Sequence, residues 1–141
     1  MSKKSRDKGS GFERELCNLF KQELGIPDLR RRLSQWQDSD EGDILVEPFL
    51  VEAKRYKQGN WFQKDWWEQC KRAAIKHNCI PLLIYRYDRQ SMRFVFPIYA
   101  VNSEWGLNSD QFSWPTDLNA LRPLVCDEDT GLTIMREWLV T

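Results

Sequence analysis

Three ionisable side chains near the middle of the chain are of the right types to hydrolyse a phosphodiester bond. They are Asp43, Glu52 and Lys54, and the glutamate follows the aspartate by nine residues. Carboxylates are the hard oxygen ligands that Mg²⁺ prefers, alongside water and a substrate phosphate. A metal ion held there would polarise the phosphoryl group and lower the pKa of its bound water. The lysine could orient or deprotonate the attacking water and offset charge developing on the phosphoryl oxygens.

The same residues also have a simpler interpretation, as solvated side chains on an exposed sheet face. A Glu-x-Lys pattern alone occurs by chance in many proteins. Here Glu52 and Lys54 interrupt the apolar run Phe49-Leu50-Val51, where an unpaired charge is costly. This setting, with Asp43 upstream, favours a functional site over chance.

A hairpin of two strands would bring these side chains together. Because side chains alternate along a strand, Glu52 and Lys54 point to the same side. The pair Glu47-Pro48 predicts a tight connection between the two strands, which returns Asp43 alongside Glu52. Two carboxylates and one ammonium group then converge at one place on a sheet.

The rest of the chain predicts helices and strands around this hairpin. Phe12, Leu16 and Phe20 recur at helical spacing, and Gly25 ends that helix. We predict helices at 10–24 and 61–77, and strands at 30–37, 43–46, 49–55, 80–87 and 93–101. Beyond residue 102 the pattern weakens, and residues 130–140 indicate a short helix or strand. This order predicts an α/β fold with a mixed central sheet flanked by helices.

Length and composition indicate one domain without a membrane anchor. The 141 residues leave room for one core, and 41% hydrophobic with 30% charged residues is typical of a folded globular protein. No apolar run approaches the roughly 20 residues of a membrane span. The charged N-terminus has no apolar segment behind it, so we expect a cytoplasmic protein rather than a secreted one.

Cysteine and histidine usage argues against a zinc site. The four cysteines form no CxxC pair and no cluster with His77, the single histidine. We therefore expect reduced, mostly buried thiols rather than zinc ligands or disulfides. The isolation of His77, at the predicted end of a helix, also argues against chemistry built on paired histidines.

The formal net charge is zero, but the charges are unevenly placed along the chain. Residues 1–90 hold 18 Lys and Arg against 14 Asp and Glu, a balance of +4. Residues 91–141 hold 3 against 7, a balance of −4. A cation on the proposed carboxylates would make the first part still more positive toward phosphate. An ordinary charged surface with an acidic tail is the alternative that charge alone leaves open.

These motifs resemble those of the PD-(D/E)xK nuclease superfamily. The resemblance rests on Asp43, then Glu52-Ala53-Lys54 on the next strand, then the helix around Gln69. The earlier segment Gly11-Phe12-Glu13-Arg14-Glu15-Leu16 resembles the opening motif of archaeal-type Holliday junction resolvases and their phage relatives. The similarity spans about residues 9–90. It departs from the pattern at Gly42, where the superfamily has the proline of its "PD" motif.

The resemblance implies a restriction-endonuclease-like αβββαβ core and a metal-dependent endonuclease for four-way DNA junctions, active in DNA recombination and repair. It implies Mg²⁺, which Mn²⁺ could replace, bound by Asp43, Glu52, Glu13 and the carbonyl oxygen of Ala53. Lys54 would be catalytic and Gln69 would lie beside the site. The domain would comprise a basic flexible arm at 1–9, a nuclease core at 10–101 and a C-terminal extension at 102–141 packed on it. No small-molecule cofactor is expected, and a bacteriophage origin is plausible.

Glu13 also has a local interpretation that sequence leaves open. The segment Ser10-Gly11-Phe12-Glu13 fits a capping box, in which the Glu13 carboxylate accepts from the backbone N–H of Ser10. Glu13 lies beside the stripe of Leu16 and Phe20, however, and so could border the sheet instead.

Basic and aromatic residues near the proposed site could contact DNA. The candidate phosphate contacts are Lys3, Lys4, Arg6, Lys8, Arg14, Arg30, Arg31, Arg32, Arg55 and Lys57. Each could equally be a solubilising surface residue. Trp61, Trp66 and Trp67 could stack on unpaired bases, but such a helix stripe is more often core or a dimer face. We favour a homodimer interface, because a junction has two symmetric strands to cut.

Three classes of function remain. The first is a structure-selective endonuclease, with restriction, mismatch or single-strand nucleases using the same residues as the nearest alternatives. The second is a non-catalytic DNA-binding module, which has no reason to gather Asp43, Glu52 and Lys54. The third is an interaction protein in which the tryptophans build an interface, and failure to bind DNA at low salt would favour it.

Overall fold

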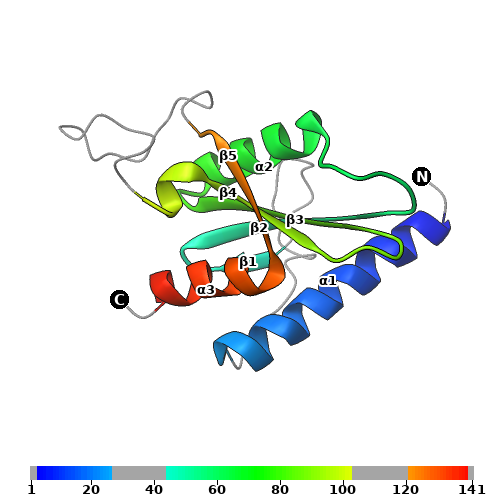
Figure 1. Cartoon of the computed structure of the whole chain (residues 1–141), viewed down its shortest axis with the longest axis horizontal. Coiled ribbons are helices and arrows are strands. Elements are labelled where there is room, and N and C mark those ends of the chain that lie inside the picture. The colour runs from blue at the N-terminus through cyan, green and yellow to red at the C-terminus, as the bar shows by residue number, and fades with distance from the viewer. Residues whose placement is uncertain (1–2, 27–43, 103–120, 140–141) are drawn as a thin grey trace.

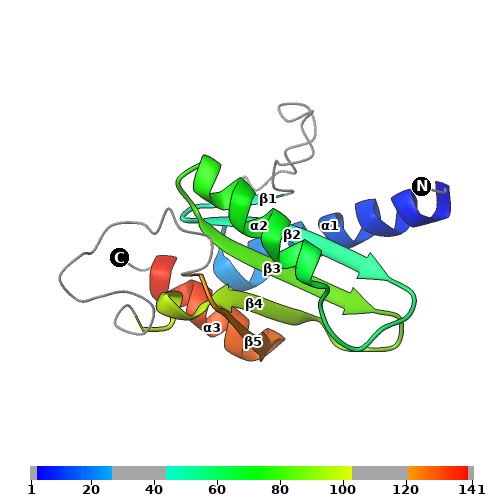
Figure 2. The same cartoon turned by 90° about the horizontal axis from the view of Figure 1, so that it is seen from above.

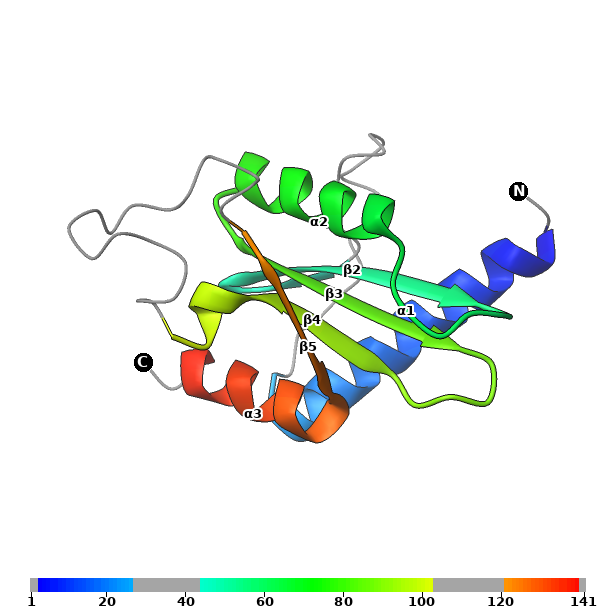
Figure 3. The same cartoon turned by 45° about the horizontal axis from the view of Figure 1, so that its top comes forward.

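The computed structural model describes residues 3–26, 44–102 and 121–139 of the chain. The elements in these ranges are, in chain order, α1 (Lys3–Leu24), β1 (Ile44–Val46), β2 (Phe49–Tyr56), α2 (Lys64–Lys76), β3 (Ile80–Tyr87), β4 (Arg93–Pro97), the 3-10 helix η1 (Ile98–Ala100), β5 (Pro123–Asp127) and α3 (Glu128–Leu139). The strands form one sheet between two helical layers. α2 covers one face, and α1 and α3 cover the other (Figures 1 and 3).

The sheet is mixed and has the strand order β1-β2-β3-β4-β5. β1 and β2 are antiparallel, as are β3 with β4 and β4 with β5. β2 and β3 are parallel, a pairing that needs a crossover connection, and α2 provides it. Seen from above, α2 lies over the two strands that it connects (Figure 2). The predicted α/β fold with a mixed central sheet flanked by helices is confirmed.

Alternation along β2 divides its side chains between two packed layers. Phe49 and Val51 pack in the larger core with Leu16 of α1. Leu50 packs on the other face, against Ala73 of α2. Because residues two apart share a face, the even-numbered side chains of β2 face α2 and the odd-numbered ones face α1 and α3. The catalytic candidates of β2, Glu52 and Lys54, are even-numbered, so they lie on the face that α2 covers.

The first helix begins earlier than predicted. α1 starts at Lys3, so residues 3–9, expected to be a flexible arm, are helical. Lysine and arginine are good helix formers, which permits this extension. Ser10 therefore lies inside α1, where its backbone N–H donates to a carbonyl one turn back. The capping box between Ser10 and Glu13 is wrong for this reason.

The middle of the chain follows the prediction closely. β1, β2 and β3 confirm the strands expected there, and the Glu47-Pro48 hairpin joins the first two. α2 begins at Lys64 rather than at residue 61. β4 ends at Pro97 rather than at residue 101, and η1 follows it. The strand expected at 30–37 lies outside the described residues.

The C-terminal segment completes the sheet in a way that the sequence pattern does not predict. β5 pairs with β4 along its whole length, with Cys126 opposite Phe94. Of residues 130–140, predicted as helix or strand, 130–139 belong to α3, which begins at Glu128 and ends at Leu139. The N–H of Thr130 donates to Asp127 Oδ1 at 2.8 Å, so the aspartate caps this helix. Residues 121–139 thus supply an edge strand and part of a helical layer.

Two expectations from composition can be compared with the structure. No helix in the described ranges is long and apolar enough to span a membrane. All four cysteines are free thiols, and Cys17 and Cys70 are buried. The prediction of mostly buried cysteines is confirmed for these two, and Cys79 and Cys126 are partly buried.

Candidate active site

Two predicted catalytic side chains lie together on β2, on the face covered by α2. Lys54 Nζ is 3.4 Å from Glu52 Oε1. Glu52 is buried, with 4% of its surface exposed. A carboxylate in such a position is costly unless an opposite charge accompanies it, and Lys54 supplies that charge. The strand alternation expected from the sequence therefore produces a close acid–base pair.

Gln69 joins this pair from α2. Lys54 Nζ donates a hydrogen bond to Gln69 Oε1, also at the long distance of 3.4 Å. The ammonium group thus lies between a carboxylate and an amide oxygen that come from two different elements. This arrangement holds the lysine head group on the α2 face of the sheet.

The third predicted carboxylate, Asp43, lies outside the described residues. It directly precedes Ile44, the first residue of β1. Ile44 pairs with Val51, the residue before Glu52. The hairpin on which the expected Asp43–Glu52 proximity depends is therefore present.

Two other candidate metal ligands, Glu13 and Ala53, lie toward the opposite layer. Glu13 is a partly exposed residue of α1, directly after the buried Phe12. α1 packs on the face of the sheet opposite α2 (Figure 3). The side chain of Ala53 also packs against the larger core on that face. The structure thus brings Glu52, Lys54 and Gln69 together, and Glu13 belongs to a different layer.

No metal-binding cluster is complete within the part of the chain that the structure describes. Groups of three or more His, Cys, Asp or Glu side chains suited to a metal ion do not occur there. Mg²⁺ commonly uses one or two carboxylates and takes its other ligands from water and phosphate. The buried carboxylate of Glu52 beside Lys54 is a hard oxygen donor of the required type.

The predicted DNA-contacting cations fall into four groups. Arg14 and Lys57 are exposed. Arg55 Nη1 lies 2.9 Å from Asp88 Oδ1, an ion pair at the ends of β2 and β3. The backbones of Lys3, Lys4, Arg6 and Lys8 belong to the first turns of α1. Arg30, Arg31 and Arg32 lie outside the described residues.

Two of the three tryptophans expected at an interface or on DNA are core residues of the protomer. Trp66 and Trp67 are 5% and 3% exposed and pack with Leu83 of β3. The Nε1–H of Trp67 donates to the carbonyl of Leu121 at 3.1 Å. Neither ring can form a dimer face or stack on a base, so the favoured interpretation is wrong for both. Trp61, 56% exposed, is the exception.

Two tyrosines adjoin the site, and sequence reasoning missed them. Tyr56 follows Lys54 by two residues, so strand alternation places it on the same face of β2. Its ring stacks on that of Trp66, with centroids 5.0 Å apart and 12° between planes. Tyr85 is the Cα partner of Lys54 on β3. Burial raises the pKa of Tyr85, partly countered by the charge of Arg93, so its phenol stays protonated near neutral pH.

Comparisons with known proteins place the chain in a family of nucleases. Residues 4–116 match the model of a family described as "Phage putative PDDEXK endonuclease". A search of curated proteins finds no match. Among solved structures, Hjc from Archaeoglobus fulgidus, a Holliday junction resolvase of an archaeal hyperthermophile, aligns with a TM-score of 0.45 and 19% identity. That alignment covers 85% of this chain and 87% of the Hjc chain.

Proposed function

Because the chain belongs to the phage PDDEXK endonuclease family, we propose that it is a metal-dependent endonuclease that cuts branched DNA, with four-way junctions as its preferred substrate. The observation that carries this proposal is the buried Glu52 carboxylate beside Lys54, with Gln69 on the same ammonium group. If the buried carboxylate of Glu52 had no function, an apolar residue at that position would make the protein more stable. The burial of the Glu52 carboxylate therefore indicates that it has a function.

We assign the metal ligands to Glu52, Asp43 and the carbonyl oxygen of Ala53, with Glu13 as a further candidate. Mg²⁺, or Mn²⁺ in its place, would supply charge neutralisation at the scissile phosphate and a bound water of lowered pKa. Glu52 has the burial expected of a ligand, because a cation and Lys54 can both offset its charge. Asp43 directly precedes the strand that pairs beside Glu52.

Lys54 is the residue to which we assign the work on the attacking water. Its ammonium group is 3.4 Å from both Glu52 Oε1 and Gln69 Oε1, which limits where the head group can move. Held there, it orients the water for in-line attack and offsets negative charge on the phosphoryl oxygens. Gln69 positions Lys54 and has no charge of its own to titrate.

Support for a four-way junction as substrate comes from the first helix. Residues 11–16 resemble the opening motif of archaeal-type resolvases, and they lie within α1. A junction has two symmetric strands to cut, so a homodimer with two sites suits it. We place the activity in the host cytoplasm, as fits a family of phage nucleases.

The test compares a synthetic four-way junction with duplex and single-stranded DNA of the same sequence, with Mg²⁺ and with EDTA. Glu52→Gln should lower the cleavage rate on the order of 100-fold or more while leaving DNA binding intact. Glu47→Gln is the matched control, because Glu47 is an exposed carboxylate in the same hairpin. Paired nicks on the junction alone, lost with EDTA and in Glu52→Gln, would support a resolvase.

The other outcomes separate the alternatives. Equal cutting of all three substrates would keep the nuclease and reject the junction preference. Tight DNA binding without cutting by the wild-type protein would reject catalysis and favour a DNA-binding module. Cutting that Glu52→Gln leaves unchanged would place the active site elsewhere.

A further inference from the structure

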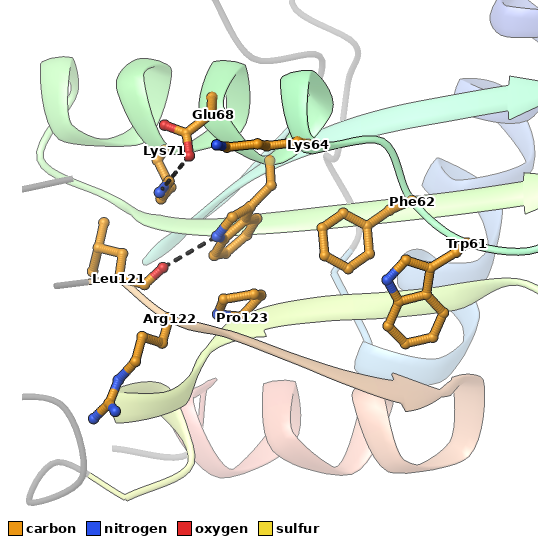
Figure 4. A pocket seen from close by; sticks show the side chains of 9 residues that line it. Trp61, Phe62, Lys64, Glu68, Lys71, Leu121, Arg122 and Pro123 are labelled. Carbon is orange, nitrogen blue, oxygen red and sulfur yellow. Dashed lines mark hydrogen bonds and ion pairs between the residues drawn. The ribbon is translucent and has the colours of Figure 1, made fainter. Parts of the chain in front are cut away.

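A groove of about 430 Å³ opens between α2 and the start of β5, on the α2 face of the sheet. Figure 4 shows the rings of Trp61 and Phe62 at one end, with Lys71, Glu68 and Arg122 toward the other. Glu68 and Lys71 lie on the side of α2 nearer β5, whereas Gln69 reaches Lys54 of β2 on the other side. The groove is therefore separate from the catalytic candidates, with α2 between them.

The lining of the groove carries an excess of positive charge. Lys64, Lys71 and Arg122 oppose one carboxylate, Glu68, which gives a formal charge of +2. The whole chain has a formal net charge of zero, so this is a local concentration of cations. Such a concentration attracts phosphate.

One of these cations is buried, which is costly for an ammonium group. Lys71 is 4% exposed. Its Nζ pairs with Glu68 Oε1 at 3.0 Å and lies 6.0 Å from the centre of the Trp67 ring. Both neighbours stabilise the charge at the wall of the groove. A hydrocarbon side chain would avoid this cost, so the buried lysine indicates that a cation is needed here.

At the aromatic end of the groove, the Trp61 ring is exposed while its backbone is held by a hydrogen bond. Trp61 is 56% exposed, yet its carbonyl oxygen accepts a hydrogen bond from the Tyr87 hydroxyl of β3. The Trp61 and Phe62 rings are 5.4 Å apart at 34°. An exposed ring in the same groove as several cations is a combination that binds unpaired nucleotides, because bases stack on the ring and phosphates meet the cations.

A row of aromatic rings links the groove to the catalytic strand. Phe62 contacts Tyr85, and Tyr85 contacts Trp66, each with ring centroids 6.1 Å apart. Trp66 in turn stacks on Tyr56, two residues beyond Lys54 on β2. The groove and the catalytic candidates thus lie on one face of one sheet, at opposite flanks of α2.

We propose that this groove binds an unpaired nucleotide of the DNA substrate, with the base on Trp61 and the phosphates beside Lys64 and Arg122. The choice of DNA rests on the proposed nuclease function, but binding in the groove does not depend on cleavage. Opened strands at a branch point would supply such a nucleotide. The groove would then add a preference for substrates with unpaired bases, which fully paired duplex lacks.

The experiment measures binding of a single-stranded oligonucleotide that carries 2-aminopurine, by anisotropy and by quenching of the probe on stacking. The parent protein is the full chain with Glu52→Gln, so that the probe stays intact. Trp61→Ala should weaken binding about tenfold and abolish the quenching, because one stacking contact is lost. Trp61→Phe should retain most of both, which separates loss of the ring from disturbance of the fold.

Arg122→Gln tests the cationic end of the groove, and Arg72→Gln is its matched control, an exposed cation of α2 outside the groove. Arg122→Gln should weaken binding at low salt and reduce the slope of log affinity against log salt by about 0.7. Arg72→Gln should leave the affinity within twofold of the parent. If both Trp61→Ala and Arg122→Gln leave the binding affinity and the quenching unchanged, the proposal is overturned.

Two further comparisons sharpen the assignment. A polyglutamate peptide should bind equally well to the parent and to Trp61→Ala. An equal loss of affinity for the peptide and for the oligonucleotide in Trp61→Ala would overturn a nucleotide site.

Cleavage by the wild-type chain separates this proposal from the proposed nuclease activity. If the wild-type chain cleaves DNA but Trp61→Ala leaves binding unchanged, only the proposal for the groove is refuted. If Trp61→Ala weakens binding but the wild-type chain does not cleave DNA, only the proposed nuclease activity is refuted.

Discussion

At the scale of single residues, the position of the Lys54 head group is the feature on which the proposed chemistry depends. Glu52 is buried beside it, and Gln69 reaches it from α2. The two contacts differ in kind. The Glu52 carboxylate offsets the charge of the Lys54 ammonium group, whereas Gln69 accepts a hydrogen bond that fixes the position of that group. The loss of Glu52 and the loss of Gln69 should therefore have different effects on cleavage.

Gln69→Ala should lower kcat about tenfold while leaving KM almost unchanged, because a positioning contact in the transition state is lost. The metal dependence should remain, since Gln69 supplies no carboxylate. Arg72→Ala, an exposed change on the same helix, is the control. Steady-state cleavage of the preferred DNA checks this, and a rise in KM without a change in kcat would contradict it.

At the scale of elements, two glycines in helices have opposite expected effects on stability. A Cβ on Gly131 of α3 would meet the ring of Phe94 in β4, whereas a Cβ on Gly11 of α1 meets nothing within 4 Å. The packing of α3 on the sheet thus depends on the absence of a side chain at residue 131.

Gly131→Ala should lower the free energy of unfolding by roughly 1–3 kcal/mol, because Phe94 must move in a packed core. Gly11→Ala should raise it by about 0.5–1 kcal/mol, since alanine restricts the unfolded chain and fits an exposed helix. Denaturant unfolding of both variants measures the difference. Equal stability of the two would refute the close approach of α3 to β4.

The cap on α3 gives a pH-dependent prediction. The side-chain and backbone hydrogen bonds from Thr130 lower the pKa of Asp127 below its usual value. A lowered folded-state pKa means stabilisation that is present above the unfolded-state pKa of about 3.9 and is lost as pH falls through the folded-state value. Asp127→Ala should therefore lower Tm at pH 7 and lower it by less near pH 2.

Asp127→Asn is the matched variant, because an amide oxygen caps nearly as well as a carboxylate and has no charge to lose. Its Tm should stay near that of the wild type at pH 7. Thermal unfolding followed by circular dichroism at both pH values measures these differences. A Tm difference for Asp127→Ala that persists undiminished at pH 2 would contradict the prediction.

At the scale of the whole molecule, the proposed homodimer must form through a surface other than the buried tryptophans of α2. Trp66 and Trp67 are buried within the protomer and cannot supply it. A dimer that cuts two strands must hold two copies of the Glu52 site at a fixed separation. Its interface must therefore leave both the α2 groove and the β1–β2 hairpin accessible.

We expect a solution mass of twice the 16.9 kDa chain, and two coordinated nicks for each junction. Light scattering across a concentration series measures the mass, and a plasmid-borne junction distinguishes paired from single nicks. A monomer at concentrations where cleavage is fast would reject the dimer and keep the nuclease.

Local pattern in the sequence was sufficient for the central part of the fold. The β1–β2 hairpin, β3 and the helical periodicity of α2 follow from alternation, turn residues and apolar spacing, all of which act over a few residues. The shared face of Glu52 and Lys54 follows in the same way. β5 was not predictable, because its short pattern gains its strand conformation from pairing with β4 some 30 residues away.

Tertiary structure alone decided which side chains meet. Gln69 reaches Lys54 because the crossover helix lies over the strands that it connects, and no sequence spacing encodes that contact. The same packing buries Trp66 and Trp67 of α2 and leaves Trp61, which precedes the helix, exposed. The sequence determined the candidate chemistry, because residue type and strand alternation are local. The burial of Glu52, its partners and the cationic groove depend on contacts between distant elements, which only the folded chain establishes.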